Sequence, residues 1–192
     1  MTGSLAYRKH EAAIIRGDVP AKYLRLLPYI PGERILEIGS AEGVLALLLA
    51  RQGKDVIALE KSEDRHEKAR QLYGEWLARE KNFPAPRFEN GGIADNLGLL
   101  ENRDTLVAVR MIYYLGDQLD TVFAEAARKV RNVVLCGNGN RASRWRRGIA
   151  EETKADNFYA SREGMRALLT RHGFKIVREV AEGDEIVVGR RD

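Results

Sequence analysis

The chain has 192 residues, enough for one domain with a hydrophobic core and short for two. Hydrophobic residues make up 44% of it and charged residues 31%, and the formal net charge is +4, a composition that excludes disordered and fibrous proteins. The longest apolar run, residues 44–50, is far shorter than the roughly 18 residues of a membrane helix, and the polar first residues do not resemble a signal peptide. We therefore expect a soluble, cytoplasmic protein with no membrane span.

The N-terminal segment, residues 5–29, has two short helical patterns separated by Gly17-Asp18-Val19-Pro20 and no strand pattern. We predict that residues 1–32 form a helical flank or lid and that residues 33–192 form the main domain.

From residue 33 onward, short β-branched runs alternate with longer helical patterns, which is typical of parallel strands joined by crossover helices. The last two strand patterns are separated only by a short turn around Gly183, which predicts an antiparallel pair. The expected fold is α/β, a doubly wound, mostly parallel seven-stranded sheet with an antiparallel final strand and helices on both faces. The predicted strands are 33–38, 55–60, 86–89, 104–110, 132–137, 174–180 and 184–190, and the predicted helices are 42–52, 62–81, 117–130 and 161–172.

The glycine-containing segment 34–44 gives the strongest local signal, because an apolar strand runs into a turn of small residues and then into a helix. Glycine lets the backbone pass close to a ligand, and a helix that begins there presents free N–H groups. The dinucleotide pattern G-x-G-x-x-G fails at Ala41 and Val44, which makes an oxidoreductase the weakest hypothesis.

The pattern that is present, E-x-G-x-x-x-G, resembles the loop of class I S-adenosylmethionine-dependent methyltransferases, and the order of strands and helices over residues 33–190 is similar to theirs. The resemblance implies that S-adenosylmethionine is the cofactor. It places Glu37 near the amino end of the methionine part and wraps the loop residues around that part. These loop residues are Gly39, Ser40, Ala41 and Gly43.

Two further cofactor positions follow the next strands. The strand 55–59 ends in Glu60, whose carboxylate can accept both ribose hydroxyls, with Lys61 beside it; the alternative is that Glu60 only caps the next helix. After the third strand, Gly92 stands where the family commonly has an aspartate that contacts adenine. Adenine recognition is therefore assigned to the backbone around Gly92 and Ile93, or to Asp95.

The candidate catalytic residues follow the fourth strand and precede the first. In this family the fourth strand ends beside the transferable methyl group, which makes Arg110 and Tyr113 candidates for positioning the acceptor and Arg110 a cofactor contact as well. The family's N/D-P-P-Y/F sequence for methylating base amines is absent there. N-terminal helices of the superfamily often close over the cofactor, so His10 or Tyr7 is a further candidate.

The segment 137–147 carries four arginines and one tryptophan after the fifth strand. Arginine suits phosphate or carboxylate, and tryptophan can stack on a sugar or base, which predicts that Arg141, Arg144 and Trp145 bind the substrate. The alternative is a solvated basic loop or helix start. Cys136, the single cysteine, lies in an apolar run and is expected to be a buried thiol, and no histidine pair has metal-ligand spacing, so no metal is predicted.

The leading hypothesis is a methyltransferase that acts on an anionic small molecule or glycan, at oxygen. An RNA methyltransferase is a second hypothesis, favoured by the arginine segment, and a noncatalytic cofactor-binding protein is a third.

Overall fold

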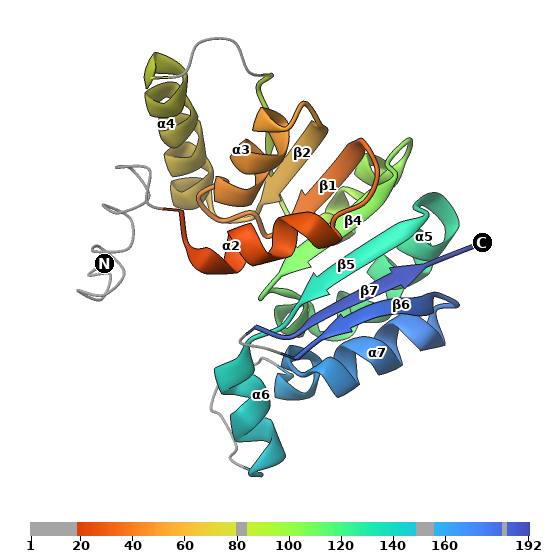
Figure 1. The fold of residues 1–192 in the computed structure, drawn as a ribbon. Coiled ribbons are helices and arrows are strands. Elements are labelled where there is room, and N and C mark those ends of the chain that lie inside the picture. The colour runs from red at the N-terminus through yellow and green to blue at the C-terminus, as the bar shows by residue number, and fades with distance from the viewer. Residues whose placement is uncertain (1–18, 80–83, 149–155, 182–183) are drawn as a thin grey trace.

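The sheet contains seven strands in the order β3-β2-β1-β4-β5-β7-β6 (Figure 1). The computed structural model describes residues 19–79, 84–148, 156–181 and 184–192. All neighbouring strands are parallel except β7, which runs antiparallel to both β5 and β6, so the predicted fold class is confirmed. The strands are β1 Arg34–Ile38, β2 Asp55–Glu60, β3 Arg87–Asn90, β4 Thr105–Val109, β5 Asn132–Cys136, β6 Lys175–Val180 and β7 Ile186–Arg190.

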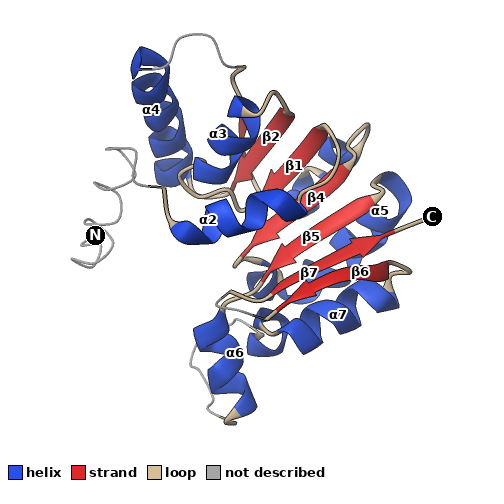
Figure 2. Ribbon diagram, viewed as in Figure 1, coloured by secondary structure: helices blue, strands red, loops and turns tan. Residues whose placement is uncertain are grey.

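Helices cover both faces of the sheet (Figure 2). Successive strand residues point to opposite faces, so Ile35 packs in one hydrophobic cluster and Leu36 in the other. The first cluster joins the sheet to α2, α3 and α4, and the second joins it to α5 and α7. The helices are α2 Ala21–Leu26, α3 Val44–Arg51, α4 Glu63–Arg79, α5 Leu119–Lys129, α6 Gly139–Arg146 and α7 Arg162–Arg171.

The N-terminal flank contributes to the first cluster. Tyr23 and Leu26 of α2 and Ile30 after it are buried together with Ile35 of β1. These contacts pack residues 21–30 on the sheet, so that α2 lies next to the ends of the strands.

Helix α6 is the main difference from the expected elements, because the sequence predicts for residues 137–147 a substrate-binding segment or a basic loop or helix start and no helix of defined length. The Asn138 side chain caps the helix by accepting hydrogen bonds from the backbone N–H groups of Asn140 and Arg141. Of its residues only Ala142 is buried, so the helix has no apolar stripe from which its length could be predicted. In Figure 1 it projects away from the sheet.

Because β7 runs antiparallel to β5, the residues around its start lie at the carboxyl ends of the parallel strands. Ile186 pairs with Cys136 at the end of β5, and the N–H of Gly137 donates to the carbonyl of Glu185 at 2.8 Å. Asp184 and Glu185 therefore lie where the parallel strands end. Cys136 is 2% exposed, and burial raises the pKa of its thiol to about 12, which confirms a buried structural thiol. No helix in the described parts of the chain is long and apolar enough to cross a membrane.

Candidate functional site

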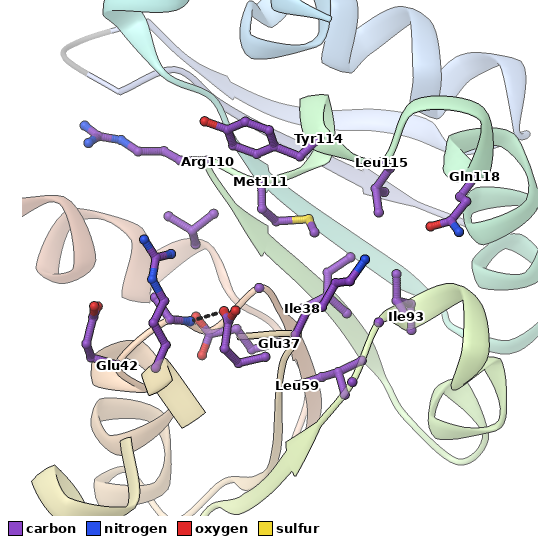
Figure 3. A pocket seen from close by; sticks show the side chains of 18 of the residues that line it. Glu37, Ile38, Glu42, Leu59, Ile93, Arg110, Met111, Tyr114, Leu115 and Gln118 are labelled. Atoms are coloured by element: carbon purple, nitrogen blue, oxygen red, sulfur yellow. Dashed lines mark hydrogen bonds between the residues drawn. The ribbon is translucent and has the colours of Figure 1, made fainter. Parts of the chain in front are cut away.

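A cavity of about 500 Å³ opens at the carboxyl ends of β1, β2 and β4 (Figure 3). In open α/β sheets this edge is where ligands bind. Its lining comes from α2, from the loop after β1, from the end of β2 and from the segments after β3 and β4. The predicted site residues among the lining are Glu37, Gly39, Ala41, Glu60, Lys61, Gly92, Ile93 and Arg110.

The loop after β1 is built from backbone in left-handed conformations. Gly39, Ala41 and Gly43 have φ angles of 66°, 52° and 72°. The N–H groups of Gly39 and Ser40 donate to the carbonyl of Leu59 at 2.8 and 3.1 Å, which fixes the loop against β2. A Cβ on Gly39 would lie 2.9 Å from Cβ of Met111, and one on Gly43 would lie 2.8 Å from the Phe88 ring. Both positions therefore require glycine.

Glu37 carries a buried carboxylate that lines this cavity. Glu37 is only 2% exposed, and its Oε2 atom has no hydrogen-bond partner among the described residues. The pKa of this carboxyl is raised to about 8, chiefly by burial; a hydrogen bond from the Ala46 backbone and the charge of Lys22 oppose the rise, and the nearby Glu60 adds to it. A buried oxygen without a partner is costly, so this site suits a ligand that brings a positively charged donor.

Glu60 connects the glycine loop with the next helix. Its Oε2 atom accepts a hydrogen bond from the N–H of Ala41, and its Oε1 atom accepts one from the N–H of Ser62, both at 2.8 Å. The residue is 8% exposed and lines the cavity. Glu60 thus satisfies a backbone donor next to α4, as a cap would, and also faces the cavity.

The segment after β3 closes another part of the cavity. The N–H of Gly91 donates to the carbonyl of Glu60 at 3.0 Å, and the Asn96 side chain donates to the carbonyl of Gly92 at 2.8 Å. Oδ2 of Asp95 lies 3.5 Å from the place a Cβ on Gly92 would take. The Asp95 carboxylate therefore lies beside Gly92. Figure 3 shows Ile93, Leu59 and Leu115 around this apolar part of the cavity.

Arg110 follows β4 with a left-handed φ of 55°, and its N–H donates to the carbonyl of Cys136 at 2.7 Å. Its Nε donates to Oδ1 of Asp184 at 3.1 Å, and its Nη2 donates to the same oxygen. The other Asp184 oxygen is buried without a partner among the described residues. Lys22 of α2 lines the same end of the cavity, and burial followed by the charge of Arg110 lowers its pKa.

Tyr113 and Tyr114 point into different spaces. Tyr113 is 2% exposed and lines a neighbouring cavity of about 430 Å³ rather than this one, and burial raises its pKa to about 12. Tyr114 is 58% exposed and lines the cavity described here. The two rings belong to the short 3-10 turn Ile112–Tyr114 and pack against each other with centroids 4.6 Å apart, and the sequence pattern alone did not show which tyrosine faces the cavity.

The predicted substrate residues of α6 do not line the cavity. Arg141 donates to Oδ1 of Asn157 at 2.9 Å and to the hydroxyl of Tyr114 at 3.0 Å, so it contacts the cavity lining at Tyr114. Arg144 is exposed, and the Trp145 ring packs 5.0 Å from the Phe158 ring. His10 and Tyr7 lie outside the described residues.

The cavity has other lining residues that the sequence patterns do not indicate, notably Lys22 and Tyr23 of α2, Arg65, Met111 and Gln118. The helical pattern of the flank indicated α2, but the lining role of its residues depends on how the helix docks. Within the described residues, no three His, Cys, Asp or Glu side chains are grouped so that they could hold a metal ion.

No protein-family model and no curated protein matches the sequence. Among solved structures, the chain is similar to magnesium protoporphyrin IX methyltransferase from Synechocystis with bound S-adenosylhomocysteine (TM-score 0.70, 19% identity, covering 100% of this chain and 90% of that one). It is also similar to a protein of echinomycin biosynthesis, described for converting a disulfide bond into a thioacetal group (TM-score 0.66, 20% identity, 94% and 91%). A third similar structure is the N-terminal domain of EvdMO1 with bound S-adenosylhomocysteine (TM-score 0.58, 19% identity, 90% and 80%).

The sheet order, the single antiparallel strand, the glycine loop at the end of β1 and these similarities agree with one another. The chain has the fold of the class I S-adenosylmethionine-dependent methyltransferases.

Proposed function

We propose that this protein is an S-adenosylmethionine-dependent methyltransferase that acts on an anionic small molecule or glycan, at oxygen. The observation that carries the proposal is the buried Glu37 carboxylate, which has one oxygen without a partner and lines a cavity beside the Gly39–Gly43 loop. An amino acid cofactor supplies the positively charged amino group that such an oxygen lacks. Ser40, whose buried hydroxyl oxygen also has no partner among the described residues, adds a polar group to this loop.

The other parts of the cofactor would be held by residues around the same cavity. We assign the ribose to Glu60 and Lys61 and the adenine to Gly92, Ile93 and Asp95, with Leu59 and Leu115 as apolar walls, because all of them line the cavity. Lys22 is suited to the methionine carboxylate because it brings a positive group to the polar end of the cavity. The volume of about 500 Å³ falls in the range of ordinary cofactor sites.

The bound cofactor supplies an electrophilic methyl group on a sulfonium. The residues of this chain bind and orient the two reactants and exclude water, and alignment of this kind can provide most of the acceleration. Tyr23, 7% exposed, and Met111, which contacts the position of Gly39, close the cavity near the loop.

Positive charge at the acceptor end supports an anionic acceptor. The acceptor end is the part beside Tyr114, where Arg110 lines the cavity. Arg110 pairs with Asp184 through Nε and Nη2, which leaves other N–H groups of its guanidinium to bind an anion. We assign the positioning of the acceptor to Arg110 and give Tyr114 the role predicted for Tyr113, because Tyr114 is the tyrosine that lines the cavity. His10 stays a candidate from sequence.

The RNA hypothesis has less support. Arg141 is bonded to Asn157 and Tyr114, and Arg146 pairs with Glu163 and Glu185 at 2.7 and 2.8 Å. Part of the basic segment thus serves contacts inside the chain. A steep loss of RNA affinity with salt would restore this hypothesis.

The test is calorimetric titration of the purified protein with S-adenosylmethionine, S-adenosylhomocysteine and NADH. We expect micromolar binding of the two sulfur ligands and none of NADH. Absence of binding by both sulfur ligands would contradict the proposal, and binding without methyl transfer to any acceptor pool would favour a noncatalytic role.

A further inference from the structure

Tyr114 presents an exposed aromatic ring at the cavity. Five large apolar side chains are notably exposed in the described part of the chain: Leu24, Leu77, Tyr114, Trp145 and Val177. Of these five, Tyr114 alone lines the cavity, and it is the most exposed at 58%. Figure 3 shows its ring beside Arg110 and above Met111. Covering such a ring with a ligand is favourable, since aromatic rings bury a large apolar area.

The ring is also held in place before any ligand arrives. The guanidinium of Arg141 donates to the Tyr114 hydroxyl at 3.0 Å and lies 5.3 Å from the ring centroid. The Tyr113 ring packs against it with centroids 4.6 Å apart and an angle of 53° between the planes. A fixed ring loses little freedom when a ligand stacks on it, so more of the contact energy becomes affinity.

Arg110 is fixed in a similar way. Its Nε and Nη2 are directed to one oxygen of Asp184, which leaves other N–H groups of the guanidinium available, and its side chain remains 38% exposed. Asp184 lies just before β7 and acts as a support for Arg110. An anion that reaches this guanidinium would meet a donor already oriented.

We propose that the methyl acceptor is a planar conjugated acid, with its ring against Tyr114 and its carboxylate on Arg110. This inference rests on the proposed function and narrows its acceptor class. A sugar acid satisfies Arg110 equally well, but it would place hydroxyl groups against the Tyr114 ring and the Met111 side chain, which offer no strong hydrogen bonds. The neighbouring walls therefore favour a flat, apolar ring.

The experiment measures the affinity of model ligands for the full chain saturated with S-adenosylhomocysteine, by calorimetry. The probes are naphthylacetate, cyclohexylacetate, naphthylethanol and glucuronate, which separate the ring, the charge and the sugar. We expect naphthylacetate to bind about tenfold more tightly than each of the others, as stacking and a charged hydrogen bond both predict. Tyr114→Leu should remove most of the preference over cyclohexylacetate.

Arg110→Met should remove the preference over naphthylethanol and weaken naphthylacetate binding by about 30-fold, the range of a lost hydrogen bond to a charged group. Arg128→Met, on the exposed side of α5, is the matched control and should change nothing. The Tyr114→Leu variant should keep its affinity for S-adenosylhomocysteine within about threefold, and circular dichroism checks that both cavity variants are folded.

Three outcomes would overturn the inference while the proposed function stands. These are equal binding of all four probes, no binding of naphthylacetate to the saturated protein, and an Arg110→Met variant that loses S-adenosylhomocysteine as strongly as the acid. Failure of the unmodified protein to bind S-adenosylhomocysteine would instead overturn the proposed function and the acceptor class with it.

Discussion

The loop after β1 and the segment after β4 meet in the same cavity but form it by different means. Both follow a parallel strand, and both contain a non-glycine residue with positive φ, Ala41 at 52° and Arg110 at 55°. In the loop after β1, the glycines have no side chains, so the backbone itself forms the surface of the cavity. In the segment after β4, Arg110, Met111 and Tyr114 form the surface with their side chains.

This difference separates the cofactor from the acceptor. A backbone surface tolerates little variation, because any Cβ at Gly39 or Gly43 meets an atom within 3 Å. A side-chain surface can be rebuilt by substitution without moving the strand below it. We therefore expect changes in the β1 loop to remove cofactor binding and changes after β4 to alter acceptor choice.

The largest expected effect is that of Gly39→Arg. The new side chain would collide with Met111 and enter the cavity, so we expect at least about a 100-fold loss of S-adenosylhomocysteine affinity, the upper range for overpacking. Gly53→Arg is the matched control, because its φ of 83° is similar but no atom lies within 4 Å of the added Cβ. It should lose about 1 kcal/mol of stability and no affinity. Circular dichroism checks both folds, and unchanged affinity in Gly39→Arg would remove the loop from the site.

Glu60→Ala should have the next largest effect. It removes a carboxylate that lines the cavity and accepts hydrogen bonds from Ala41 and Ser62. Affinity for S-adenosylmethionine should fall by about 1–3 kcal/mol, the cost of losing hydrogen bonds to a charged acceptor. Glu63→Ala, an exposed change at the start of α4, is the control for effects on that helix. Equal affinities of the two variants would mean that Glu60 only caps α4.

The pH dependence of cofactor affinity should show whether Glu37 in the β1 loop region contacts the cofactor. Its pKa of about 8 means that the carboxyl holds a proton at pH 6 and must release it to pair with a cationic amino group. Affinity should therefore rise with pH by up to about tenfold per unit and level off above about pH 8, with proton release on binding below that pH. Titration in buffers of different ionisation enthalpy measures that release, and Glu37→Gln should abolish it. A pH-independent affinity in the unmodified protein would contradict this role.

The same carboxyl should affect folding stability in the opposite sense to an ordinary salt-bridged acid. Because its folded pKa lies above the ordinary value of 4.5, the folded state binds more protons than the unfolded state between about pH 4.5 and 8. Its contribution to the free energy of unfolding is thus largest below that window and is lost as pH rises, by at most about 1.4 kcal/mol per unit. Urea unfolding of the unmodified protein and Glu37→Gln should show the smaller slope in the variant; parallel slopes would argue against a buried proton.

The smallest effect should come from α6. Arg144→Gln lies outside both cavities, so we expect less than about a twofold change in affinity for S-adenosylhomocysteine. A change as large as that of Glu60→Ala would extend the site to α6 and revive the substrate role predicted there.

The sequence indicates those parts of the site whose structure depends on residues close together in the chain. The strands, the glycine loop and Glu60 lie within continuous apolar and small-residue patterns, and the structure places them at one cavity. Lys22 and Tyr23 reach that cavity only because Leu26 and Ile30 dock α2 on the sheet, which no local pattern states. Tyr113 and Tyr114 differ only in direction within a 3-10 turn, and α6 lacks an apolar period, so neither could be resolved from sequence alone.

The antiparallel direction of β7 also has a practical consequence for handling the protein. β7 begins at the carboxyl ends of the parallel strands, where the cavity lies. Its last residue, Arg190, pairs with Asn132 at the start of β5, so it lies at the opposite end of the strands from the cavity (Figure 1). An affinity tag, fluorophore or sensor surface attached beyond Asp192 would therefore leave the cavity open to titrated ligands.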